Sequence, residues 1–188
     1  METSEAREHL EIVDRVLSQA DQTVFVGGDI FLVWGIASGS LDVVFQLGAE
    51  SRIGVAWYAA VALAFALAIV YTIIRVRGLS SHSKRMSRAQ YEYLNVLWLV
   101  FGITAVASSA AFNIFSGWSA AALWTIAAAI VTAYIAIHGN RRAAVGAVIL
   151  IASLVAASFM PHVPGYVLAA GMLVGYSGFG LATMLARD

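Results

Sequence analysis

Six apolar stretches, each long enough to form a helix that crosses a lipid bilayer, make up most of the sequence. About 20 consecutive apolar residues are needed to cross the hydrocarbon core, because an α-helix rises only about 1.5 Å per residue. The stretches are continuous and rich in alanine and leucine, whereas the strands of a transmembrane barrel are shorter and alternate in polarity. We therefore expect an all-α membrane protein with spans near residues 24–46, 53–74, 93–114, 118–138, 143–160 and 165–186.

The composition supports lipid, rather than water, as the solvent for most of the chain. Hydrophobic residues make up 61% of the sequence and charged residues 12%, about half the roughly 25% of a soluble domain. Acidic and basic residues balance to a formal charge of zero, which suggests no nucleic-acid partner. The absence of cysteine excludes disulfides and thiolate metal sites.

Basic residues are distributed unequally between the two predicted sides of the membrane. Arginine and lysine gather between spans two and three, between spans four and five, and near both chain ends, whereas Arg52 lies in a loop of the opposite side. Cytoplasmic loops carry the excess of Lys and Arg, so both termini are predicted to lie in the cytoplasm. The spans then form three helical hairpins, which occupy residues 23–188.

Residues 1–22 are predicted to form a separate cytoplasmic amphipathic helix. Apolar residues recur there at spacings of three and four, and they form one stripe: Leu10, Val13, Leu17 and Ala20. The opposite face is acidic, with Glu5, Glu8, Glu11 and Asp14. Because anionic headgroups repel such a face, we expect the helix to pack beneath its own bundle or to dock a partner or a second protomer.

Small residues predict where the helices pack closely. Lipid tails are as apolar as leucine, so membrane helices associate through close contacts between small side chains. Two faces with GxxxG-type spacing stand out, one on the first span (Gly28, Gly35 and Gly39) and one on the sixth (Gly171, Gly175 and Gly178). They predict packing within the chain or, alternatively, an oligomer interface.

Ionisable residues within membrane spans are costly, so each is a candidate functional residue. Asp29 lies near the inner end of the first span, where Arg75 or Arg142 would be within reach. Asp42 lies near its outer end, on the glycine face, and Asn113 is a candidate partner for it. These aspartates are interpreted either as hydrogen-bonded or ion-paired structural groups, or as a polar vestibule for a small solute or a partner's basic group.

The remaining candidate residues give no complete site. Glu92 is predicted at the inner mouth of the third span and His138 at the inner end of the fourth, while His162 falls on the outer side. No two histidines share a helix face at ligand spacing, so we expect no haem, metal or other cofactor. The string Gly175-Tyr176-Ser177-Gly178 is similar to the motif around the serine of rhomboid proteases, but no histidine follows Ser177 to activate it.

Six spans in three short hairpins, basic cytoplasmic linkers, and the stretches LVWGIASGSLDVVF and LVFGITAVASSAAF resemble the HdeD-type small membrane proteins of bacteria. The resemblance covers the whole chain as architecture, and it implies a location in the bacterial inner membrane. It carries no diagnostic functional motif. Energy-coupling-factor substrate-binding subunits are also similar in size and span count, although Gly35, Gly39 and Asp42 do not match their docking motif.

The sequence as a whole favours a non-enzymatic membrane protein, an accessory, regulatory or stress-related subunit that self-associates or binds a membrane partner. An ion-driven pump places carboxylates near the middle of the bilayer. The predicted midplane here carries no charge, with Gly35, Ala64, Gly102, Ala127, Ala152 and Val174 near that depth. The alternative is a small-solute transporter or channel component that uses the two ends of the first span.

Overall fold

The computed structural model describes residues 27–54, 56–82, 88–114 and 117–185, and every regular element within them is a helix. In chain order these are α2 (Gly28–Ala49), α3 (Ala56–His82), α4 (Arg88–Ile114), α5 (Gly117–Ile137), α6 (Arg141–Phe159), α7 (Pro164–Gly171), η1 (Met172–Ser177) and α8 (Gly178–Met184). The last three are continuous, and together they are called the C-terminal helix (Pro164–Met184). The amphipathic helix predicted for residues 1–22 lies outside the described residues.

Four of these helices are long and apolar enough to cross a membrane: α2, α3, α6 and the C-terminal helix. With 22 residues, α2 is about 33 Å long, against a hydrocarbon core of about 30 Å. α4 and α5 have 27 and 21 residues, and the apolar parts found in them run over Asn95–Ala107 and Ala121–Ile137. The predicted all-α class is thus confirmed for the described part of the chain, and a total of six crossings stays a prediction.

Local sequence explains the sharp turns that join α5, α6 and the C-terminal helix. Gly139 adopts a φ of 96°, a left-handed conformation that glycine reaches without steric cost and that commonly ends a helix. The side chain of Asn140 then accepts hydrogen bonds from the backbone N–H groups of Arg142 and Ala143, at 3.1 and 3.2 Å, and caps α6. Pro164 begins the C-terminal helix, where its missing N–H costs no helical hydrogen bond.

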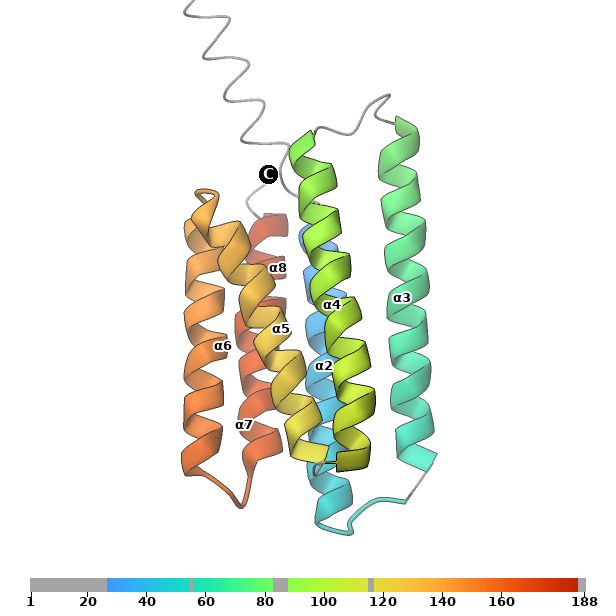
Figure 1. Cartoon of the computed structure of the whole chain (residues 1–188), viewed down its shortest axis with the longest axis vertical. Coiled ribbons are helices and arrows are strands. Elements are labelled where there is room, and N and C mark those ends of the chain that lie inside the picture. Colours follow the sequence, from blue (N-terminus) through green and yellow to red (C-terminus); the bar gives the residue numbers. More distant parts are fainter. Residues whose placement is uncertain (1–26, 55, 83–87, 115–116, 186–188) are drawn as a thin grey trace, which may run out of the picture.

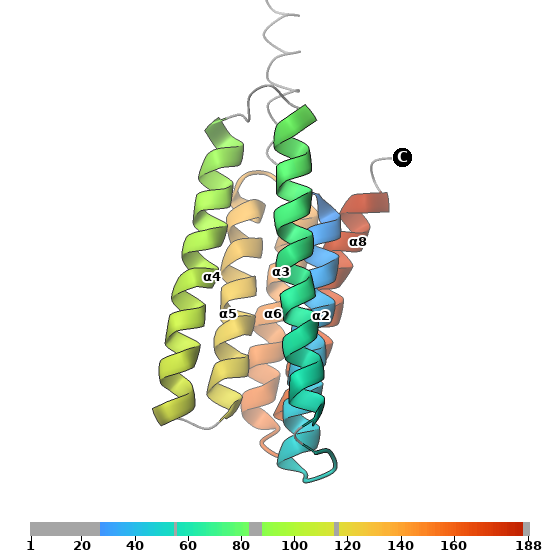
Figure 2. The same cartoon turned by 90° about the vertical axis from the view of Figure 1, so that its right-hand side faces the viewer.

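Successive helices run in opposite directions, so the chain forms three hairpins placed side by side (Figure 1). The pairs α2–α3, α4–α5 and α6–α7 each pack together, and α5 also packs along α6. α2 lies at the centre, because it contacts α3, α5 and all three parts of the C-terminal helix. α3 lies at the edge of the bundle and, within the described part, packs chiefly against α2, as Figures 1 and 2 both show.

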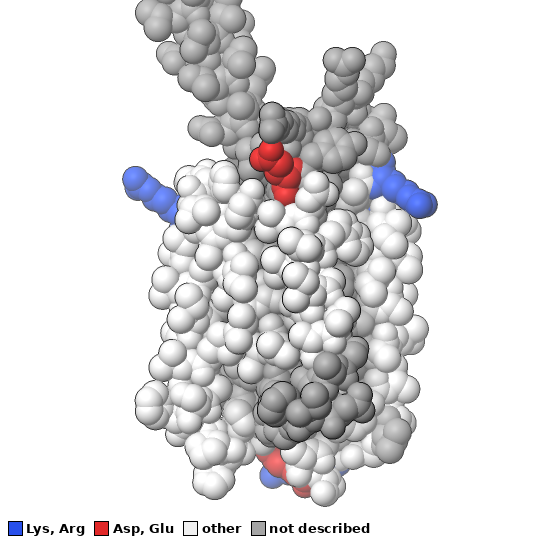
Figure 3. All heavy atoms as spheres, viewed as in Figure 1, with Lys and Arg blue, Asp and Glu red and all other residues white. Residues whose placement is uncertain are grey.

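The interior is filled by apolar side chains and the outer surface is apolar as well. Phe31, Val131, Leu150 and Met172 are almost completely buried between α2, α5, α6 and the C-terminal helix. On the outside of α3, Leu63 and Leu67 are 61% and 60% exposed. In the view of Figure 3, charged side chains of described residues stand at the two ends of the bundle, with a band free of them in between. Such a belt suits a surface that faces lipid.

Candidate functional site

A polar cluster joins α2 to α3 near the start of α2, at the end of the bundle that carries most of the described basic residues. Arg75 Nε donates to Asp29 Oδ2 over 2.6 Å, and the hydroxyl of Tyr71 donates to the same oxygen over 2.7 Å. Tyr71 and Arg75 are four residues apart on α3, so a single helix face presents both groups to the carboxylate. Of the two partners considered for Asp29, the structure selects Arg75.

Arg142, the other candidate partner, has a different contact. Its Nη1 donates over 3.0 Å to the backbone carbonyl of Ala182, close to the end of α8. Cationic side chains favour the last carbonyls of a helix, because those carbonyls carry partial negative charge. Arg142 therefore ties α6 to the C-terminal helix and takes no part in the Asp29 cluster.

Asp42 lies in a very different setting, although it belongs to the same helix. The residue is 2% exposed, and its Oδ2 atom is buried with no hydrogen-bond partner within the described part of the structure. The partner considered for it, Asn113, falls within the bounds of α4, but its side chain lies outside the described part. The Asp42–Asn113 contact therefore stays a prediction.

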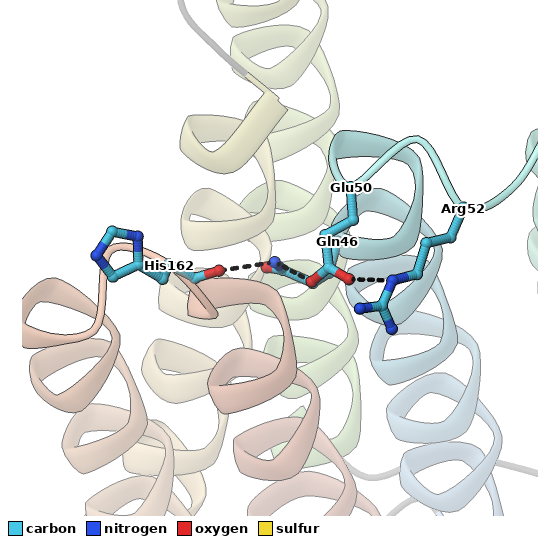
Figure 4. A network of polar contacts seen from close by, with 4 residues as sticks. All are labelled: Gln46, Glu50, Arg52 and His162. Atoms are coloured by element: carbon cyan, nitrogen blue, oxygen red, sulfur yellow. Dashed lines mark hydrogen bonds and ion pairs between the residues drawn. The ribbon is translucent and has the colours of Figure 1, made fainter.

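A second polar network closes the opposite end of α2, one turn beyond Asp42 (Figure 4). Gln46 is 2% exposed; its Nε2 donates to Glu50 Oε1 at 2.8 Å and to the carbonyl of His162 at 3.0 Å. Its Oε1 accepts from the backbone N–H of Gly165 at 3.1 Å, and Arg52 pairs with Glu50 at 3.0 Å. The network links α2 to the turn before α7. In the sequence, the one indication of this network was a glutamine, Gln46, inside an apolar stretch.

The other candidate residues are separate from these clusters. Glu92 is exposed on α4, and His138 is exposed at the end of α5, where its Nδ1 lies 2.8 Å from the carbonyl of Tyr134. Among the residues the structure describes, no three His, Asp or Glu side chains are grouped so as to hold a metal ion. Asp29, Asp42, Glu92 and His138 therefore do not converge on one described site.

The glycines of the first span pack against the C-terminal helix. A Cβ atom on Gly28 would overlap the carbonyl of Gly180, one on Gly35 would overlap Ser177, and one on Gly39 would lie 3.0 Å from Leu173. Gly180 was not part of either predicted glycine face. A Cβ atom at this position would nevertheless lie 2.5 and 2.6 Å from backbone atoms of α2. These positions have no room for a side chain because the two helix backbones approach closely.

Two of the three glycines predicted on the last span face α6, and the third has room for a side chain. A Cβ on Gly171 would overlap Ser153, and one on Gly175 would lie 3.0 Å from the carbonyl of Gly146. For Gly178 the nearest such atom, the carbonyl of Leu173, would be 3.8 Å away, an ordinary contact. Gly171 and Gly175 therefore make contacts within the chain. This was one of the two interpretations of the glycine face, the other being an oligomer interface.

The rhomboid-like string coincides with a wide turn of the C-terminal helix. Met172–Ser177 forms a π-helix, a rare conformation that is frequent at functional sites. The hydroxyl of Ser177, which is 5% exposed, donates over 3.3 Å to the carbonyl of Leu32 on α2. This contact supports the interpretation of the string as a helix-packing face.

Four aromatic rings from four helices meet inside the bundle, a cluster that the sequence analysis missed. Trp34 stacks on Phe101 and meets Phe65 edge to face, and Trp124 contacts the same two phenylalanines in the same two ways. Ring centroids lie 5.7–5.9 Å apart, and the indole N–H of Trp34 donates to Thr72 over 2.9 Å. The rings connect α3 and α4 to the rest of the bundle.

No family model, no curated protein and no solved structure matches the chain. The resemblance to HdeD-type proteins therefore stays a prediction from the sequence.

Proposed function

We propose that the chain is a non-enzymatic, multi-pass protein of the bacterial inner membrane, which acts as an accessory, regulatory or stress-related subunit through self-association or a membrane partner. Six spans cross the bilayer, and both termini face the cytoplasm. The end of the bundle with Arg75, Arg77, Arg141 and Arg142 is the cytoplasmic end, since basic residues are retained on that side.

The observation that carries the proposal is the filling of the bundle interior at mid-depth. The aromatic cluster of Trp34, Phe65, Phe101 and Trp124 occupies the space between α2, α3, α4 and α5. The close glycine contacts occupy the space between α2 and the C-terminal helix. A solute pathway needs polar groups that are available along the pore. The buried hydroxyls of Thr72, Thr104, Thr125, Thr132 and Ser153 instead donate to a backbone carbonyl three or four residues earlier in their own helix. The surface through which the protein acts is therefore the outer surface of the bundle.

Native mass spectrometry after gentle extraction tests whether the protein has a partner. We expect a homo-oligomer or a complex with a second membrane protein. Since the chain has no cysteine, single cysteines then locate the interface without a background reaction. Val106 on α4 and Ile151 on α6, 73% and 51% exposed, report on two different faces. Cross-linking of one variant and not the other is the expected result, and a strictly monomeric particle that cross-links at neither position would contradict the proposal.

Asp42 favours a second candidate function, a small-solute transporter or channel component. A buried carboxyl oxygen without a described partner is a natural ligand for a cation or for a donor group on a solute. The network of Gln46, Glu50 and Arg52 begins one helical turn beyond this residue and extends to the exposed end of the bundle. Solute uptake by proteoliposomes that depends on Asp42 would favour this function over the first.

A further inference from the structure

An apolar groove runs along the outside of the bundle between α2 and α3. It has a volume of about 570 Å³ and is lined mainly by aliphatic side chains, including Val33, Ile36, Ala37, Ala64 and Leu67, together with Tyr71. Small residues line it from both helices, Ala37 on α2 and Ala64 and Ala68 on α3. Such an apolar lining suits a hydrocarbon chain.

One end of this groove is polar. Tyr71 both lines the groove and donates its hydroxyl to Asp29, so the Asp29–Arg75 pair sits directly beside the furrow. Asp29 engages the guanidinium through Nε, and the two Nη groups of Arg75 make no hydrogen bond within the described part of the structure. The side chain of Arg75 is 42% exposed, whereas that of Asp29 is 16% exposed. Of the two charged side chains, that of Arg75 is therefore the more accessible from outside the bundle.

We propose that this groove binds an anionic phospholipid of the cytoplasmic leaflet, an inference that rests on the membrane orientation given under Proposed function. The phosphate binds the Nη groups of Arg75, and one acyl chain occupies the apolar furrow. Charge complementarity selects this occupant, because arginine recognises phosphate through paired N–H donors and basic pockets between membrane helices bind anionic headgroups. The apolar helix of a second protein would leave these donors unsatisfied.

In this arrangement Asp29 is a positioning residue. Its carboxylate accepts hydrogen bonds from Arg75 Nε and from the Tyr71 hydroxyl. These contacts fix Arg75 at the inner end of the groove. The carboxylate is the less exposed member of the pair, at 16% against 42% for Arg75, so a headgroup meets the positive side chain first. The site therefore selects a headgroup that carries net negative charge over a zwitterionic one, whose own cation Arg75 would repel.

The test measures which lipid the purified full-length protein retains. The protein in detergent is given equal amounts of phosphatidylglycerol and phosphatidylcholine with identical acyl chains, and the bound lipids are counted by native mass spectrometry. We expect phosphatidylglycerol to be retained about tenfold more strongly, because both lipids carry the phosphate that Arg75 binds and only phosphatidylcholine adds a cation that Arg75 repels. Equal retention of the two lipids, or displacement of phosphatidylglycerol by millimolar inorganic phosphate, would overturn the proposal.

Two matched pairs of variants separate the headgroup contact from the groove. The double variant D29N/R75Q removes both charges together and should abolish the preference, whereas R141Q at the same end of the bundle should keep it. Leu67→Trp fills the groove, and Leu63→Trp changes an equally exposed leucine of α3 that does not line it. Loss of lipid with Leu67→Trp alone is expected even if the double variant fails to fold, and equal retention by both tryptophan variants would contradict the site.

The outcomes also distinguish this site from the proposed function. A protein that stays integral to the membrane and self-associated but shows no lipid preference would contradict the lipid site alone. A chain that is not embedded in the membrane would contradict both.

Discussion

Three polar residues of α2 differ in how fully their side chains are hydrogen-bonded within the described part of the structure. Asp29 shares its carboxylate with Tyr71 and Arg75, and Gln46 satisfies both ends of its amide. Asp42, between them, keeps one oxygen without a described partner. A buried polar atom that lacks a hydrogen bond costs about 1–3 kcal/mol, so Asp42 is the residue whose role a substitution resolves best.

If Asp42 is structural, its shape and its remaining hydrogen-bonding capacity matter and its charge does not. Asp42→Asn should then change the free energy of unfolding by less than about 1 kcal/mol, and Asp42→Leu should lower it by about 1–3 kcal/mol and impair assembly. Thermal unfolding in detergent, with size-exclusion chromatography as a check on assembly, measures both. A cation-binding role predicts the same intact fold for Asp42→Asn together with loss of ion binding, which a binding measurement on the purified variant would detect.

The sequence was informative about residues whose charge restricts their partners, and less so about neutral ones. Asp29 at the inner end of an apolar stretch had few cationic side chains at its depth, and Arg75 was one of the two considered. Gln46 and Trp34 could bond to many groups, and nothing in their spacing indicates which. Their partners depend on how each helix is rotated about its own axis. When nearly all residues of a helix are apolar, the sequence shows no periodicity from which that rotation can be inferred.

At the level of helices, apolar length and small-residue spacing carried most of the information. Each described helix overlaps its predicted span, but α3 continues to His82, eight residues past the predicted end, and α4 begins at Arg88, five residues early. Apolarity marks where lipid surrounds a helix, while backbone hydrogen bonds continue into polar sequence until a breaker intervenes. The π-helix at Met172–Ser177 had no sequence signal, because it depends on the fit of the C-terminal helix between α2 and α6.

Helix packing predicts opposite effects for two glycine-to-alanine substitutions. Gly180→Ala places a Cβ 2.5–2.6 Å from backbone atoms of α2, which cannot rotate away, and should cost about 1–3 kcal/mol of stability. Gly102 lies inside α4, where a Cβ would meet no atom within 4 Å, so Gly102→Ala should be neutral or stabilising by up to about 1 kcal/mol. Unfolding midpoints of the two variants give the comparison. Equal effects would argue against the close approach of α2 and α8.

The molecule as a whole is a bundle with apolar sides and polar ends. Aromatic rings and close backbone contacts fill its interior, and on the face seen in Figure 3 the described charged side chains stand at the two ends of the bundle. Backbone groups of such rods pair within each helix, which is the requirement that hydrocarbon imposes on any chain crossing it. Partner binding, the lipid site and the assignment of a cytoplasmic end all depend on this one property.

The most direct test of that property maps which ends of the helices face the outside of the cell. Single cysteines replace Ser51, His138 and His162, three exposed residues in turns between helices. With a membrane-impermeant maleimide on intact cells, we expect labelling at Ser51→Cys and His162→Cys, and labelling at His138→Cys only after permeabilisation. Labelling of all three from outside, or release of the protein from membranes by an alkaline wash, would contradict the account.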